Sequence, residues 1–143
     1  MQRHVDYAVQ FGPVNWLAIA VSVIANFVIG GLWYSPVLFV RPWLNMSGVN
    51  KQVFDAGLPK ALLGDLLSAI AIAIVLNQVL RWSGAIGFGS GLLVSVVVWV
   101  GFVASVLLTQ VTYEHRPFAF FSISAGYRLV ALIVMGIILS TWR

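Results

Sequence analysis

Two charged side chains, Asp65 and Arg128, stand inside long apolar stretches of this sequence. If the stretch at residues 118–141 is a helix, Arg128 lies ~15 Å from its start, close to the centre of a bilayer. An arginine at that depth costs roughly 2.5 to 3.5 kcal/mol and therefore usually pairs with another group or faces water. Helical side chains point towards the N-terminus of their helix, which brings Arg128 towards the depth of Asp65. We expect these two side chains to form an ion pair.

Uncharged polar side chains fall at similar depths in the apolar stretches. They are Asn26, Ser68 and Ser124, with Ser105 and Thr109 nearer the same end. Together with Asp65 and Arg128 they predict a ligand-binding polar pocket, in which Arg128 attracts a small anion or a carboxylate. The alternative is a purely structural role. Polar side chains also hydrogen-bond between membrane helices, and a buried ion pair can fix the register of helices without any ligand.

The remaining polar residues form no pattern typical of catalysis. His4 and His115 do not stand at a metal-ligand spacing such as i, i+4. Glu114, His115 and Arg116 are consecutive, so we expect solvated charges rather than a converging acid–base group. The chain has no cysteine, which excludes thiolate nucleophiles and iron–sulfur clusters. We expect no enzyme activity, no metal and no cofactor, although an intramembrane hydrolase would need only a few of the plentiful serines.

The elements that position these residues are membrane-spanning helices. The 143 residues are 61% hydrophobic and 8% charged, whereas about a quarter of the residues in a soluble domain are charged. Apolar stretches of ~18 residues or more predict membrane spans, here at residues 14–34, 61–80, 90–111 and 118–141. The predicted fold class is all-α. The chain is a polytopic integral membrane protein with four transmembrane helices as two antiparallel hairpins, in a single membrane domain over residues 1–143.

Composition also indicates the partners. The lipid bilayer is the expected surrounding, and nucleic-acid binding is excluded because the basic residues stand singly between apolar stretches instead of gathering on one face. Tryptophan prefers the headgroup level, and Trp99 is the exception because it lies in mid-span. A bundle of this size covers Arg128 poorly by itself, which favours a homo-oligomer. Small residues such as Gly101 and Ser105 would let helices approach closely, within the chain or between copies.

The connection at residues 35–60 is the longest. Pro36 ends the first helix, and residues 37–46 mix apolar and basic side chains, which predicts an interfacial segment lying on the membrane surface. A buried plug or a re-entrant turn is the alternative.

An even number of spans places both termini on one side, here called side A, whereas residues 35–60 and 112–117 connect the spans on side B. The basic residues outside the spans are Arg3, Arg81 and Arg143 on side A, and Arg41, Lys51, Lys60 and Arg116 on side B. This difference in the number of basic residues only slightly favours an orientation with side B in the cytoplasm. We expect a multi-pass protein of the bacterial inner (plasma) membrane.

Short motifs also link the sequence to a known family. They are NWLAI at residues 15–19, GGLWYSP at 30–36, PWL at 42–44, WVGF at 99–102 and GYRLV at 126–130. With these motifs, the chain resembles over residues 14–142 the bacterial and fungal membrane proteins grouped as domain of unknown function 1761. The resemblance implies a four-span integral membrane protein and carries no assigned activity, cofactor or catalytic residue. Small multidrug exporters are four-span chains as well, but that family uses a glutamate in its first span, where this chain has Asn26 and no acid.

The function that the sequence favours is permeation or transport of a small solute or anion, with a polar pocket around Arg128 and Asp65. The clustering of polar groups towards side B is the reason for this interpretation. The alternative is a non-transporting membrane scaffold or accessory subunit, for which the conspicuous element is the segment at residues 37–46.

Overall fold

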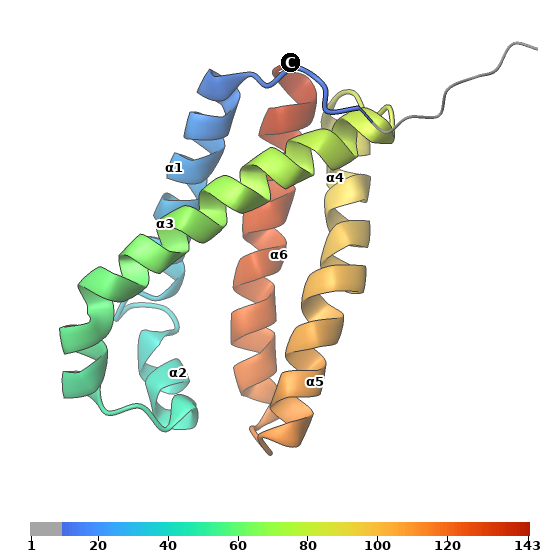
Figure 1. Cartoon of the computed structure of the whole chain (residues 1–143). Coiled ribbons are helices and arrows are strands. Elements are labelled where there is room, and N and C mark those ends of the chain that lie inside the picture. The colour runs from blue at the N-terminus through green and yellow to red at the C-terminus, as the bar shows by residue number, and fades with distance from the viewer. Residues whose placement is uncertain (1–9) are drawn as a thin grey trace, which may run out of the picture.

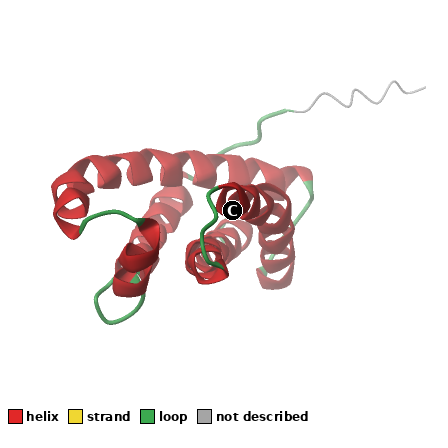
Figure 2. Ribbon diagram, turned by 90° about the horizontal axis from the view of Figure 1, so that it is seen from below, coloured by secondary structure: helices red, strands yellow, loops and turns green. Residues whose placement is uncertain are grey.

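The computed structural model describes residues 10–143, and in that range it contains helices and loops only (Figures 1 and 2). The elements are α1 (Trp16–Trp33), α2 (Val40–Ser47), α3 (Lys51–Trp82), α4 (Phe88–Val98), the π-helix η1 (Trp99–Ala104), α5 (Ser105–Tyr113) and α6 (Phe118–Thr141). Segments α4, η1 and α5 form one continuous helix, Phe88–Tyr113. Residues 10–143 therefore contain five helices, and four of them are long and apolar enough to cross a membrane.

The predicted all-α fold with four membrane spans is confirmed, and the protein is a multi-pass integral membrane protein whose long apolar helices lie in the lipid bilayer. The first described residues and the C-terminus lie at the same end, the upper end in Figure 1. This end is side A, and α2 lies at the opposite end, side B. The residues Arg3 and His4 considered above lie outside the described residues.

Helix α6 is the centre of the bundle. It packs against α1, α3 and α4, and Figure 1 shows it between α1 and the α4–α5 helix, with α3 crossing obliquely. The buried apolar core joins α1, α3 and α6 through small and aliphatic side chains. It comprises Ala18, Ile19, Val23, Ala69, Ala73, Leu76, Leu80, Ala85, Leu132, Met135 and Leu139.

Helix α3 is longer than predicted. It begins at Lys51, whereas the span was expected at residues 61–80, so the second half of the connection at residues 35–60 is helical. Its 32 residues extend ~48 Å, more than the ~30 Å of hydrocarbon that a span must cross. The extra turns carry charge, including the exposed ion pair of Lys51 with Asp55 at 2.6 Å. A search for uncharged stretches stops where such charges begin and therefore misses these turns.

Small residues bring α4 and α6 into close contact. A Cβ atom added at Gly91 would lie 2.7 Å from the backbone oxygen of Gly136. The hydroxyl of Ser140 donates to the backbone oxygen of Gly87 at 2.9 Å. By contrast, nothing lies within 4 Å of a Cβ built at Gly101, and Ser105 is exposed and bonds to the backbone of its own helix. Close approach within the chain thus uses the small residues in the side A half of α4 and α6.

Candidate functional site

The structure brings Asp65 and Arg128 together inside the bundle. Nη2 of Arg128, on α6, lies 3.6 Å from Oδ1 of Asp65, on α3. The two side chains are 32% and 27% exposed, respectively. Because the N···O distance exceeds the 2.7 to 3.2 Å typical of a hydrogen bond, the two groups form an ion pair without close hydrogen bonding.

Asn26 connects this pair to α1. Its side chain is 1% exposed, its Nδ2 donates to Oδ2 of Asp65 at 3.4 Å, and its Oδ1 accepts from the hydroxyl of Tyr127 at 3.1 Å. The guanidinium of Arg128 also lies over the ring of Tyr127, 4.9 Å from its centroid. The four residues Asn26, Asp65, Tyr127 and Arg128 form one intramembrane polar cluster from three helices.

Tyr127 was not predicted to belong to this cluster. The available signal was its position, because a tyrosine in mid-span is away from the headgroup level that tyrosine prefers. Its hydroxyl then needs a partner inside the bundle, and Asn26 is that partner.

One nitrogen atom of the Arg128 guanidinium, Nη1, is buried and has no hydrogen-bond partner among residues 10–143. A buried donor without a partner costs about 1 to 3 kcal/mol, so such atoms in a folded protein call for an explanation. The guanidinium can therefore donate a hydrogen bond to a further negatively charged or polar group.

Arg128 lines two cavities. The larger, here called the side B cavity, measures about 650 Å³ and lies between the side B ends of the helices. Its polar lining residues are Tyr34, Asp65, Gln110, Ser124, Tyr127 and Arg128. A volume in this range is typical of small-molecule pockets.

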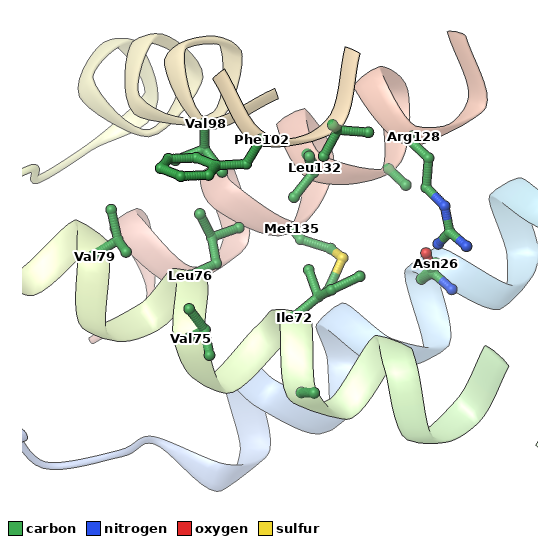
Figure 3. Close-up of a pocket in the computed structure, with 13 residues that line it drawn as sticks. Asn26, Ile72, Val75, Leu76, Val79, Val98, Phe102, Arg128, Leu132 and Met135 are labelled. Atoms are coloured by element: carbon green, nitrogen blue, oxygen red, sulfur yellow. The ribbon is translucent and has the colours of Figure 1, made fainter. Parts of the chain in front are cut away.

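The smaller cavity, here called the apolar cavity, measures about 310 Å³ and lies between α3 and the α4–η1 helix, against α6. Asn26 and Arg128 are its polar lining residues, and Figure 3 shows them side by side at one end, with Val79 and Val98 towards the other. The remaining walls are aliphatic apart from Phe102. The polar cluster thus separates a cavity with several polar groups from one that is almost entirely apolar.

Not every predicted pocket residue reaches these cavities. Ser124 lines the side B cavity and Asn26 the apolar cavity, whereas Ser68 is exposed on α3 and lines neither. Ser105 and Thr109 are exposed as well, and their hydroxyls bond to backbone oxygens of their own helix. Gln110, which was not predicted, lines the side B cavity.

Helix α2 covers the side B cavity. Trp43 lines the cavity, and its ring lies 5.8 Å from Tyr34, 6.0 Å from Phe54 and 5.8 Å from Phe120, measured between centroids. Arg41 is exposed on the same helix. The segment predicted to lie on the surface thus has one exposed face, while Trp43 on the other face packs inward.

Arg116 fastens α2 to the turn between α5 and α6. Its Nη1 donates to the backbone oxygens of Ser47 at 2.6 Å and Met46 at 3.1 Å, at the C-terminal end of α2. Its Nε donates to Glu114, and this hydrogen bond, followed by one from Gln110, lowers the pKa of Glu114.

Glu114 and Arg116 therefore meet, contrary to the expectation that consecutive residues do not converge, whereas Glu114 and His115 are exposed, as expected of solvated charges. His115 has φ 53°, a left-handed conformation that turns the chain so that its two neighbours can meet.

No group of three or more potential ligands that could hold a metal ion occurs within residues 10–143, counting His, Cys, Asp and Glu. The polar cluster supplies one carboxylate beside one guanidinium, which is an arrangement for binding a charged or polar group.

A family model described as "Protein of unknown function (DUF1761)" matches residues 17–140, which is most of the chain and includes the whole polar cluster. Comparison with curated proteins found no match, and comparison with solved structures found none either.

Proposed function

Since this chain belongs to the DUF1761 family, a family of unknown function, we propose that it is a permeation protein of the bacterial inner membrane that binds a small organic anion at Arg128. The observation that carries this proposal is the Nη1 atom of Arg128, which is buried without a partner among residues 10–143. An anion supplies the acceptor that this donor lacks, and charge-assisted hydrogen bonds of this kind are about twice as strong as neutral ones.

Asp65 acts in this proposal as an exchangeable counter-ion. In the absence of substrate it neutralises Arg128 from 3.6 Å, which limits the cost of a charge in the membrane. Because this distance is too long for a good hydrogen bond, an arriving anion displaces the carboxylate without breaking a close hydrogen bond. Asn26, which donates to Asp65, holds the displaced carboxylate.

The side B cavity is the route to Arg128, and α2 is its cover. Trp43 must move, or the cavity must open beside it, for a solute to enter from side B. The contacts of Arg116 with the backbone of Ser47 and Met46 hold the cover in place. The proposal involves permeation without a chemical reaction.

Uptake by reconstituted vesicles tests the proposal. Methanesulfonate is a suitable probe because it stays ionised at neutral pH and does not leak through lipid as a neutral acid. We expect radiolabelled methanesulfonate to enter vesicles that contain the wild-type protein, and uptake to fall to the level of empty vesicles in Arg128→Ala. The matched control is Arg41→Ala, which removes an exposed arginine outside both cavities and should retain uptake.

Wild-type vesicles that take up no more methanesulfonate than empty ones, with the protein shown to be folded and monodisperse, would contradict the proposal. Equal uptake by the wild-type protein and Arg128→Ala would contradict the role of Arg128.

A further inference from the structure

The apolar cavity gives a reason to specify the anion further. Its polar lining residues are Asn26 and Arg128, and Figure 3 places both at one end. The other eleven lining residues are apolar, and they form the walls between that end and Val79 and Val98. The surface of this cavity is almost entirely apolar and the cation Arg128 lies at its end, so the cavity suits the apolar tail of a molecule whose anionic head lies at Arg128.

We infer that the ligand is an amphiphilic organic anion with a short, unbranched aliphatic tail. This inference rests on the proposed anion binding at Arg128. The anionic head occupies the side B cavity at Arg128, where Gln110 and Ser124 supply further polar groups. The tail passes Arg128 into the apolar cavity, between α3 and the α4–η1 helix. Arg128 lines both cavities, so a molecule whose charge lies at Arg128 reaches both of them once that side chain turns aside.

The walls of the apolar cavity also reach the surface of the bundle. Val75 on α3 is 60% exposed and Phe102 on η1 is 77% exposed, and both line this cavity. An aliphatic tail that is already dissolved in the bilayer can therefore enter between α3 and η1. Transfer of a tail from lipid to an apolar cavity has no hydrophobic driving force, so selectivity for the tail comes from contacts with these walls.

Competition by alkanesulfonates of increasing length tests this inference. Partitioning into lipid by itself raises the apparent affinity of longer chains, so each competitor is compared between protein variants in identical vesicles. The readout is the concentration of hexanesulfonate that halves the uptake of labelled methanesulfonate. The variant designed to fill the apolar cavity is Val75→Trp. The matched control is Val97→Trp, because Val97 is 61% exposed on α4 and lines neither cavity.

We expect Val75→Trp to raise the halving concentration of hexanesulfonate severalfold, because the indole occupies space in which the tail would contact the walls. The halving concentration is compared with each variant's own uptake of methanesulfonate, and Val97→Trp should behave as the wild-type protein does. A second variant, Phe102→Ala, enlarges the cavity without filling it and should make octanesulfonate a better competitor relative to hexanesulfonate.

Two other outcomes would contradict the inference. If the wild-type protein takes up methanesulfonate, but Val75→Trp and Val97→Trp respond equally to hexanesulfonate and Phe102→Ala leaves the order of competitors unchanged, the tail does not occupy the apolar cavity. The inference is then wrong while the proposed function stands. If the wild-type protein takes up no methanesulfonate and hexanesulfonate does not bind, both are wrong.

Discussion

The ion pair of Asp65 and Arg128 should contribute measurably to folding, and a double-mutant cycle measures by how much. The substitutions are Arg128→Gln and Asp65→Asn, alone and together. At the observed 3.6 Å, Coulomb attraction at an effective dielectric constant of about 20 amounts to roughly 4 to 5 kcal/mol. Desolvation of both ions offsets part of this attraction. We expect a coupling free energy of about 2 kcal/mol, which changes the unfolding equilibrium about thirtyfold.

The assay is unfolding in mixed micelles with increasing dodecyl sulfate, followed by tryptophan fluorescence. The six tryptophans of the chain supply the signal. Each single variant should be destabilised because it leaves one uncompensated charge in the membrane. The double variant should lose less stability than the two single variants combined. Arg41→Gln is the control, because Arg41 is exposed and has no ion pair within residues 10–143, and it should shift the free energy of unfolding by less than about 0.5 kcal/mol.

Additive effects would refute the reasoning. If the free-energy changes of the two single variants sum to that of the double variant within about 0.5 kcal/mol, the two groups do not interact energetically. Solvent would then screen the pair fully, and Asp65 could not serve as the resting counter-ion of Arg128.

Two further predictions concern packing and the side B turn. Gly91→Ala should destabilise the protein by about 1 to 3 kcal/mol, because its Cβ would meet the backbone of Gly136 at 2.7 Å. The matched variant Gly89→Ala, with nothing within 4 Å of its Cβ, should be neutral or stabilising by up to ~1 kcal/mol; equal losses in dodecyl sulfate unfolding would contradict the packing argument. Because hydrogen bonds from Arg116 and Gln110 lower the pKa of Glu114 below 4.5, its contribution to stability is present above the ordinary value and is lost as the pH falls through the lowered one. Wild-type and Glu114→Gln proteins should therefore differ in Tm at neutral pH and converge only below about pH 4.5, whereas a Tm difference that stays the same from neutral to acidic pH would show that the pKa is not lowered.

The spans and the ion pair could be predicted because both depend on depth in the membrane. Uncharged stretches locate helices by the cost of charge in lipid, and the rise of ~1.5 Å per residue converts sequence position into depth. That reasoning placed Asp65 and Arg128 within reach of each other, and the structure has them 3.6 Å apart.

Depth does not specify which way a side chain faces around its helix. Ser68 lies one turn from Asp65, yet it is exposed. Because α3 crosses the bundle obliquely, its successive turns face different neighbouring helices. The same limit explains why Gln110 and Tyr127 were missed, although both lie at suitable depths. The turn at His115 depends on a left-handed backbone conformation, which a residue other than glycine adopts rarely.

The π-helix η1 explains why the apolar cavity is a feature of the fold and not a packing defect. Trp99, which was unexplained in mid-span, begins η1, and its indole donates to the backbone oxygen of Ala125 on α6 at 2.9 Å. The wider turn that follows lies beside the cavity, because Phe102 and Val103 of η1 line it. On the side A end of the same helix, Gly91 holds α4 against α6. The helix is thus fixed to α6 at two levels while α3 crosses away from it, and the space left between them ends at Arg128. Because π-helical turns are rare and occur frequently at functional sites, this arrangement supports the proposal that the apolar cavity holds a ligand.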